Sequence, residues 1–341
     1  MTGHPKDARS KATAPVTLAD IAKLAGVSLV TVSRAINTPH LVKPRTLEAI
    51  ETAIARTGYV PNLLAGGLAS RKTKLVAAIV PSVASTMFAE TIEGLNAELV
   101  SAGYQVLLGL SGYDIDQERE LTRAILARRP DGIILTGIAH LKETRAMLTG
   151  AGLPIVEIWD STPSPLDTAV GFSHPAVGAL VAEYLLAAGY DRYAQIGAND
   201  PRAMQRRDGF IKRLTGIATV ETSTIEMSAP ATFKDGRRAV GELLDQGGGS
   251  IAVFCSSDVV AHGALTEAYV RGCRIPEDLA IVGFGDFDFA PYTHPPLTTV
   301  RIDRRMIGTK AARAILAKLS GDETVVPMID IDFEIIKRAT A

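Results

Sequence analysis

From Leu75 onward, short apolar runs alternate with segments of helical period, and this alternation restricts the fold more than any other feature. Seven runs have the length and composition of buried strands: Leu75–Val80, Gln105–Leu110, Gly132–Thr136, Ile155–Ile158, Tyr193–Ile196, Ile251–Cys255 and Leu279–Val282. Helices are predicted near Met87–Ala102, Asp116–Arg128, Lys142–Ala151, Pro175–Ala188, Arg202–Leu214, Phe233–Gln246, Val259–Arg271 and Arg304–Leu319. Such alternation is typical of parallel sheets covered by helices on both faces. The number of units favours two α/β lobes with a ligand site in the cleft between them.

The segment before residue 60 has a different pattern, that of a small all-α module. Thr17 caps a first helix, Asp20 completes a capping box, and Gly26 ends the helix in a left-handed conformation. The predicted helices are Leu18–Leu24, Leu29–Ala35 capped by Ser28, and a third that starts at Pro44 and closes at Gly58. These short helices predict a compact bundle.

Charge is divided unevenly between the two parts. Residues 1–74 carry eleven Lys and Arg against four Asp and Glu, whereas residues 75–341 carry 25 basic against 33 acidic groups. The net charge of −1 therefore hides a basic first part, +7, and an acidic remainder, −8. This division favours a nucleic-acid-binding module on a carrier that does not bind DNA.

Several other features limit the class of protein. Cys255 and Cys273 are spaced for neither a metal site nor a disulfide framework, which favours a reduced, cytoplasmic protein. Residues 1–16 are polar and predict a disordered tail rather than a signal peptide. No stretch approaches the about 18 apolar residues of a membrane span.

The segment TLADIAKLAGVSLVTVSRAIN, Thr17–Asn37, has the pattern of a helix-turn-helix. Such a motif needs a small residue where the helices touch, a glycine in the turn and a second helix free to enter the major groove. Ala22 and Gly26 meet these needs. The short donors suited to phosphate oxygens are Ser28, Thr31, Ser33 and Asn37. Arg34 can bond a guanine edge bidentately.

With these residues the chain resembles the lactose-repressor family of transcription regulators. The headpiece pattern is matched by Asp20, Ala22, Ala25, Gly26, Val27, Ser28, Thr31, Val32, Ser33, Arg34 and Asn37. The segments GYVPN at 58–62, VGF at 282–284 and PPLTT at 295–299 extend the resemblance over the whole chain. The resemblance implies a repressor that binds double-stranded operator DNA and a small sugar or sugar-acid effector between periplasmic-binding-protein-like lobes.

The resemblance also implies a set of DNA contacts. Leu29 and Val30 take the leading positions of the recognition helix and suit thymine methyls, while Arg34 supplies most direct readout. Leu63–Ser70 resembles a hinge helix whose Leu68 enters the minor groove. Tyr59 and Asn62 match backbone contacts, although a packing tyrosine and a loop cap remain the alternative. The DNA-binding set is Thr17, Ser28, Leu29, Val30, Thr31, Ser33, Arg34, Asn37, Tyr59, Asn62, Ala65 and Leu68.

Six residues match effector-binding positions of the family: Phe88, His140, Asp160, Phe172, Arg206 and Asp258. Segments such as EIWDS at 157–161 and LDTAVGF at 166–172 look like the branch that contains gluconate-operon repressors. A sugar acid suits Arg206, whose guanidinium pairs bidentately with a carboxylate. The alternatives are a surface ion pair for Arg206, a helix cap for Asp258 and an ordinary surface or capping role for His140.

The expected organisation follows from these matches. We expect a tail at 1–16, a headpiece at 17–62, a hinge at 63–74 and an effector and dimerisation domain at 75–341. Within that domain, lobe 1 is expected at about 75–172 and 302–331, and lobe 2 at about 173–301 and 332–338. The end of the chain has no leucine heptad, so a homodimer is expected rather than a tetramer.

Rival functions have less support. A transport sugar-binding protein does not explain the basic headpiece, and no catalytic constellation supports a sugar-acid enzyme. No GxGxxG or GxxxxGK[ST] motif occurs, so no nucleotide cofactor is expected. Asp286 and Asp288 lack a third neighbouring ligand, so no metal is expected. The sequence leaves open whether the effector releases or promotes DNA binding.

Overall fold

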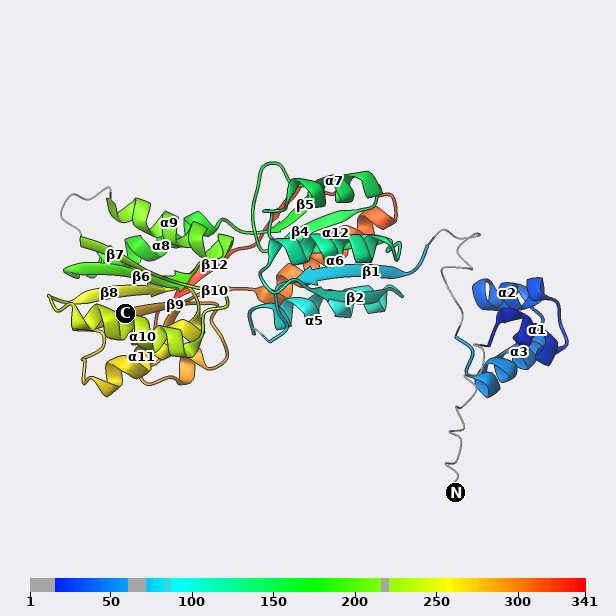
Figure 1. The fold of residues 1–341 in the computed structure, drawn as a ribbon, viewed down its shortest axis with the longest axis horizontal. Coiled ribbons are helices and arrows are strands. Elements are labelled where there is room, and N and C mark those ends of the chain that lie inside the picture. Colours follow the sequence, from blue (N-terminus) through cyan, green and yellow to red (C-terminus); the bar gives the residue numbers. More distant parts are fainter. Residues whose placement is uncertain (1–15, 61–71, 85, 216–220) are drawn as a thin grey trace, which may run out of the picture. The chain divides into compact units, whose positions relative to one another are not determined.

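The computed structural model describes residues 16–60, 72–84, 86–215 and 221–341. Two compact units divide the chain, residues 1–73 and residues 74–341, and each is described by itself. Figure 1 shows a small helical unit and a larger unit built from two sheets. The expected fold, an all-α headpiece and a two-lobed α/β domain, is confirmed.

The headpiece contains α1 (Leu18–Ala25), α2 (Leu29–Asn37), a 3₁₀ turn (Pro39–Leu41) and α3 (Pro44–Thr57). The capping box is present: Thr17 N–H donates to Asp20 Oδ2 at 2.8 Å, and Asp20 N–H donates to Thr17 Oγ1. Gly26 and Gly58 end α1 and α3 with φ of +67° and +65°, where a side chain would be strained. The small core consists of Ile21, Ala22, Val32, Ala35, Ile50 and Ala53.

The first lobe has a parallel sheet of order β11-β5-β4-β3-β1-β2. Its strands are β1 (Leu75–Val80), β2 (Gln105–Leu110), β3 (Gly132–Thr136), β4 (Ile155–Ile158), β5 (Thr168–Gly171) and β11 (Met328–Asp330). Its helices are α5 (Thr86–Ser101), α6 (Ile115–Leu126), α7 (Lys142–Ala151) and α12 (Arg304–Leu319). Alternate strand residues pack against α5 and α12 on one face and against α6 and α7 on the other.

The second lobe has a sheet of order β12-β10-β9-β8-β6-β7, parallel except for β12. Its strands are β6 (Arg192–Ala198), β7 (Glu221–Met227), β8 (Ile251–Cys255), β9 (Leu279–Phe284), β10 (Thr298–Ile302) and β12 (Phe333–Ile336). Its helices are α8 (His174–Leu186), α9 (Pro201–Thr215), α10 (Phe233–Asp245) and α11 (Asp258–Val270), with a 3₁₀ turn at Ala290–Tyr292. Pairs α8–α9 and α10–α11 pack against its two faces.

The chain passes between the lobes three times, after β5, after β10 and after β11. These crossings bring the carboxyl ends of both parallel sheets toward one cleft, where open α/β sheets bind ligands. Within the described ranges, none of the helices combines the length and the apolar character that a membrane crossing requires.

Candidate functional site

The exposed face of α2 carries the residues predicted to meet DNA bases. Leu29 and Val30 are 50 % and 66 % exposed, although both are large apolar side chains. Arg34 is also exposed, and its guanidinium makes no ion pair or hydrogen bond within the described headpiece. Exposed apolar side chains and an arginine without an ion pair suit contacts with base edges in the major groove.

The other residues predicted to contact DNA differ in whether their side chains already have partners within the headpiece. Ser28 accepts the Thr31 N–H at 3.2 Å as the N-cap of α2, and the two hydroxyls are 2.8 Å apart. Asn37 donates to the Ser33 carbonyl, and Thr17 is held in its capping box. Tyr59 is half-buried against the headpiece core, so the packing alternative has support. Asn62, Ala65 and Leu68 lie outside the described residues, as does the proposed hinge helix.

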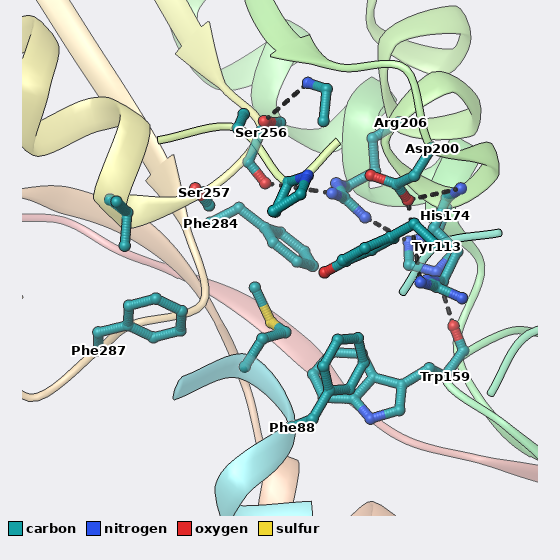
Figure 2. A pocket seen from close by; sticks show the side chains of 16 residues that line it. Phe88, Tyr113, Trp159, His174, Asp200, Arg206, Ser256, Ser257, Phe284 and Phe287 are labelled. Atoms are coloured by element: carbon teal, nitrogen blue, oxygen red, sulfur yellow. Dashed lines mark hydrogen bonds and ion pairs between the residues drawn. The ribbon is translucent and has the colours of Figure 1, made fainter. Parts of the chain in front are cut away.

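The second candidate site is a small cavity of about 100 Å³ between the two lobes (Figure 2). The first lobe contributes aromatic residues from the start of α5 and from loops after β2 and β4. The second lobe contributes polar residues from α9 and from the turn between β8 and α11. The lining residues include Met87, Phe88, Tyr113, Trp159, His174, Asp200, Arg202, Arg206, Ser256, Ser257, Val259, Phe284 and Phe287.

Arg206 is the central polar group of this cavity. Its Nη1 donates to His174 Nδ1 at 2.9 Å, and its Nη2 donates to the Ser256 carbonyl at 3.2 Å. The guanidinium lies 3.9 Å from the centroid of the Phe284 ring, and its buried Nε has no partner. No carboxylate of the described chain lies within ion-pair distance of it. Burial lowers the pKa of Arg206 to about 10, so the side chain is still charged at neutral pH, but its burial is unfavourable.

The local packing explains why Arg206 lies so deep. Glycines occupy the contact between α8 and α9, Gly178 on one helix and Gly209 on the other. A Cβ on Gly178 would overlap the Arg206 carbonyl oxygen, and a Cβ on Gly209 would overlap the backbone of Pro175. The two helices therefore approach closely, and this approach places the Arg206 side chain under the floor of the cavity.

Aromatic rings make up much of the cavity wall. Phe88 lies edge-on to Trp159 at 5.5 Å between centroids, and Trp159 lies edge-on to Phe172 at 6.0 Å. Figure 2 shows the Tyr113 side chain between Arg206 and the Phe88–Trp159 pair. Burial raises the pKa of Tyr113, so its hydroxyl stays protonated and available as a donor. A polar floor with apolar walls suits a ligand that has hydroxyl groups and C–H faces.

Of the six predicted effector residues, only Phe88 and Arg206 line this cavity. The side chains of the other four make internal contacts, and their effector roles stay predictions. Asp160 accepts from Ser161 N–H and from Gln205 Nε2 at 3.2 Å, next to the cavity but not in its wall. Phe172 packs behind the wall between the rings of Trp159 and Phe284.

Asp258 has a structural role in the second lobe. Its two carboxylate oxygens accept from Thr299 Oγ1 at 2.5 Å and from Phe287 N–H at 2.7 Å. Burial raises its pKa to about 6, against the effect of these bonds. The N-cap of α11 is the preceding residue, Ser257, so the alternative of a capping role for Asp258 is wrong. Asp258 instead ties the Phe287 loop to β10.

His140 is enclosed by two carboxylates of the first lobe rather than by the cavity. Its Nδ1 lies 2.7 Å from Glu118 Oε1, and its Nε2 lies 3.3 Å from Glu157 Oε1 in a poorly aligned ion pair. Burial lowers the pKa of His140, but the interactions with Glu118 and Glu157 raise it more, to about 9. His140 is therefore the cation of a buried triad that joins α6 to β4.

This triad predicts a pH-dependent stability. The folded pKa is raised above the unfolded value, so the contribution is complete below about pH 6.5 and is lost as pH rises through about 9. We expect wild type to lose about 3 kcal/mol of unfolding free energy relative to His140→Gln across this window. Urea unfolding at several pH values measures it. His294→Gln, at an exposed histidine, should parallel wild type, and a constant difference for His140→Gln contradicts the prediction.

The structure adds cavity residues that the sequence did not single out: His174, Asp200, Arg202, Ser256 and Ser257. Asp200 and Arg202 flank the start of α9, and Ser256 and Ser257 directly precede α11. His174 follows β5 of the first lobe, and the other four follow strands β6 and β8 of the second lobe, so position at a strand end was the available signal.

Two family models match parts of this chain. Residues 17–62 match the family described as bacterial regulatory proteins, lacI family, and residues 182–341 match the periplasmic binding protein-like domain. The chain is 35 % identical to the HTH-type transcriptional regulator GntR of Pseudomonas aeruginosa, over 97 % of each chain.

Solved structures show the same architecture. A lacI-family regulator from Silicibacter pomeroyi superposes with a TM-score of 0.89 at 32 % identity, covering 96 % of this chain and 99 % of that one. The lac repressor dimer bound to operator and the anti-inducer ONPF has a TM-score of 0.80 at 26 % identity, covering 96 % and 99 %. These relatives are regulators and not enzymes. The chain therefore belongs to the lacI family of bacterial regulatory proteins, and it is a DNA-binding transcriptional repressor.

Proposed function

We propose that this repressor binds a pseudo-palindromic operator as a homodimer in the cytoplasm and that a sugar acid in the cavity between the lobes controls its operator affinity. The observation that carries the effector class is Arg206, a buried guanidinium that lines the cavity without a carboxylate partner. A carboxylate ligand supplies the missing charge and accepts from the unpaired donor.

The relatives support the same class. Proteins named GntR are among them, including the Pseudomonas aeruginosa regulator and a Chromobacterium violaceum structure with a TM-score of 0.74 and 36 % identity. The aromatic wall formed by Phe88 and Trp159 suits the C–H face of a sugar chain. Arg206 and Phe88 are our proposed effector contacts, together with Tyr113 and Arg202.

The proposed organisation assigns residues 17–62 to the DNA-binding headpiece, 63–74 to the hinge and 75–341 to the effector and dimerisation domain. A dimer has support from exposed apolar side chains of the second lobe, Tyr269, Val270 and Tyr292, which are 74 %, 65 % and 86 % exposed. Two headpieces on one dimer match the two halves of a palindrome. Sedimentation equilibrium that gave the mass of a single chain would contradict this assembly.

Fluorescence anisotropy with a palindromic probe from upstream of the protein's own gene tests the proposal. At fixed salt, D-gluconate should change operator affinity by about 10-fold or more, whereas the uncharged analogue D-glucitol should not. Operator must change the affinity for gluconate by the same factor by which gluconate changes the affinity for operator, because the coupling free energy is reciprocal. If the protein binds the operator specifically but no aldonate changes its affinity, the protein is still a repressor, and the proposed sugar-acid effector is wrong.

A further inference from the structure

His174 holds Arg206 in a geometry that permits only one protonation state of its ring. It is the first residue of α8, and its side chain is fully buried. Its Nε2 lies 2.7 Å from the Trp159 carbonyl oxygen, and its Nδ1 lies 2.9 Å from Arg206 Nη1 (Figure 2). A carbonyl only accepts and a guanidinium only donates, so Nε2 must carry the proton and Nδ1 must be bare. The ring is thus neutral and of one tautomer.

The surroundings of the ring favour this neutral form. Burial lowers the pKa of His174 well below its ordinary value, and the neighbouring charges of Arg206 and Arg202 lower it further. The other sides of the ring are covered by Phe172 at 4.6 Å and Phe284 at 6.5 Å between centroids, which offer no charge. A protonated His174 ring could not accept the hydrogen bond from Arg206, and its positive charge would be repelled by the Arg206 guanidinium.

The contact joins the two lobes at the cavity. Arg206 belongs to α9 of the second lobe, whereas Trp159 follows β4 of the first. Trp159 is itself fixed, because its indole N–H donates to Thr91 Oγ1 in α5 at 3.1 Å. A guanidinium that binds a ligand is therefore linked through one imidazole to the backbone of the opposite lobe.

We infer that neutral His174 is a positioning residue, which aims the Arg206 guanidinium at the anionic group of the effector and ties it to the first lobe. This inference rests on the proposed function, since it assigns how the same cavity selects an acid. Arg206 makes no ion pair within the described residues, and His174 supplies the acceptor that orients it. Without that acceptor the guanidinium keeps only the Ser256 carbonyl and the Phe284 ring as contacts, so it is less well oriented, which weakens the binding of an acid more than that of an uncharged polyol.

Titration calorimetry of the full-length protein with D-gluconate and D-glucitol tests the inference. His174→Phe keeps a ring of similar shape but removes both polar contacts, and it should weaken gluconate binding about 10- to 100-fold. Glucitol binding should change less than about 3-fold. His174→Asn places an amide oxygen near the Nδ1 position and should restore much of the gluconate affinity. Equal losses for both probes in both variants, with a lowered Tm, would show a purely structural residue and overturn the inference.

A second measurement keeps the inference separate from the effector class. The ¹⁵N resonances of His174, assigned by their loss in His174→Asn, should show the neutral Nε2–H tautomer unchanged between about pH 6 and pH 8. Arg206→Met should disturb these resonances. If wild type binds no aldonate, the proposed effector class fails while this readout still tests the His174–Arg206 link. An imidazolium or an Nδ1–H tautomer in wild type overturns the inference under either outcome.

Discussion

Arg206→Met is expected to abolish the response of operator binding to gluconate while leaving operator affinity in its absence unchanged. Methionine fills much of the same volume but removes the charge and every donor that an acid could use. A charged hydrogen bond is worth about 1.5–3 kcal/mol, so losing even one weakens gluconate binding about 10- to 100-fold. Anisotropy titrations of the operator complex with gluconate measure the loss directly.

The same substitution should not destabilise the protein, which separates a ligand-binding cation from a structural one. Burial holds the pKa of Arg206 below its ordinary value, so the empty cavity bears the cost of a desolvated charge. Replacing that charge by an apolar side chain offsets the two lost hydrogen bonds, and Tm should stay within a few degrees of wild type. A large drop in Tm would mean that Arg206 stabilises the lobes rather than a ligand.

Arg207→Met is the matched control on the same helix. Arg207 points away from the cavity and pairs with Asp208 and with Glu226, at 2.7 Å from the latter. Its partly exposed ion pairs contribute little to stability. Gluconate response should therefore be the same as in wild type, and an equal loss in both variants would indicate a general charge effect on α9.

Most of the architecture was predictable because buried parallel strands have a distinctive composition. All seven expected strands are present, and several have the predicted bounds, such as Leu75–Val80 and Ile251–Cys255. The five strands that were missed have weaker patterns. β7, β11 and β12 lie at sheet edges, where one side is exposed, and β7 has mostly polar residues. β5 has four residues, and β10 begins with two threonines.

The cavity was less predictable than the fold. Position at a strand end indicates an edge of the sheet, but it does not say which way a side chain points. His140 and Asp258 both follow strands, yet each found internal partners, two carboxylates in one case and Thr299 with Phe287 N–H in the other. Those partners are 17 to 41 residues away along the chain, so no local pattern reveals them.

Arg34→Ala is expected to lower operator affinity about 10- to 100-fold, the effect of losing one bidentate contact to a guanine edge. Leu29 and Val30 beside it have no hydrogen-bonding groups, so Arg34 has no substitute among the leading residues of α2. Anisotropy at fixed salt, with the parent operator and with single base-pair variants of each half-site, measures both the affinity and its dependence on sequence. Arg56→Ala, an exposed arginine on α3, serves as the control of equal charge change.

The pattern of losses distinguishes a base contact from a phosphate contact. If Arg34 contacts a guanine, Arg34→Ala should bind the parent operator and one particular base-pair variant equally well, because the discriminating bond is gone in both. If it contacts only phosphate, affinity should fall by a similar factor for every sequence and become less dependent on salt. With the second pattern, only Leu29 and Val30 would remain to read bases directly. Their contacts with thymine methyl groups cannot distinguish the other bases by hydrogen bonding. The repressor would then depend on the deformability of its operator for most of its specificity.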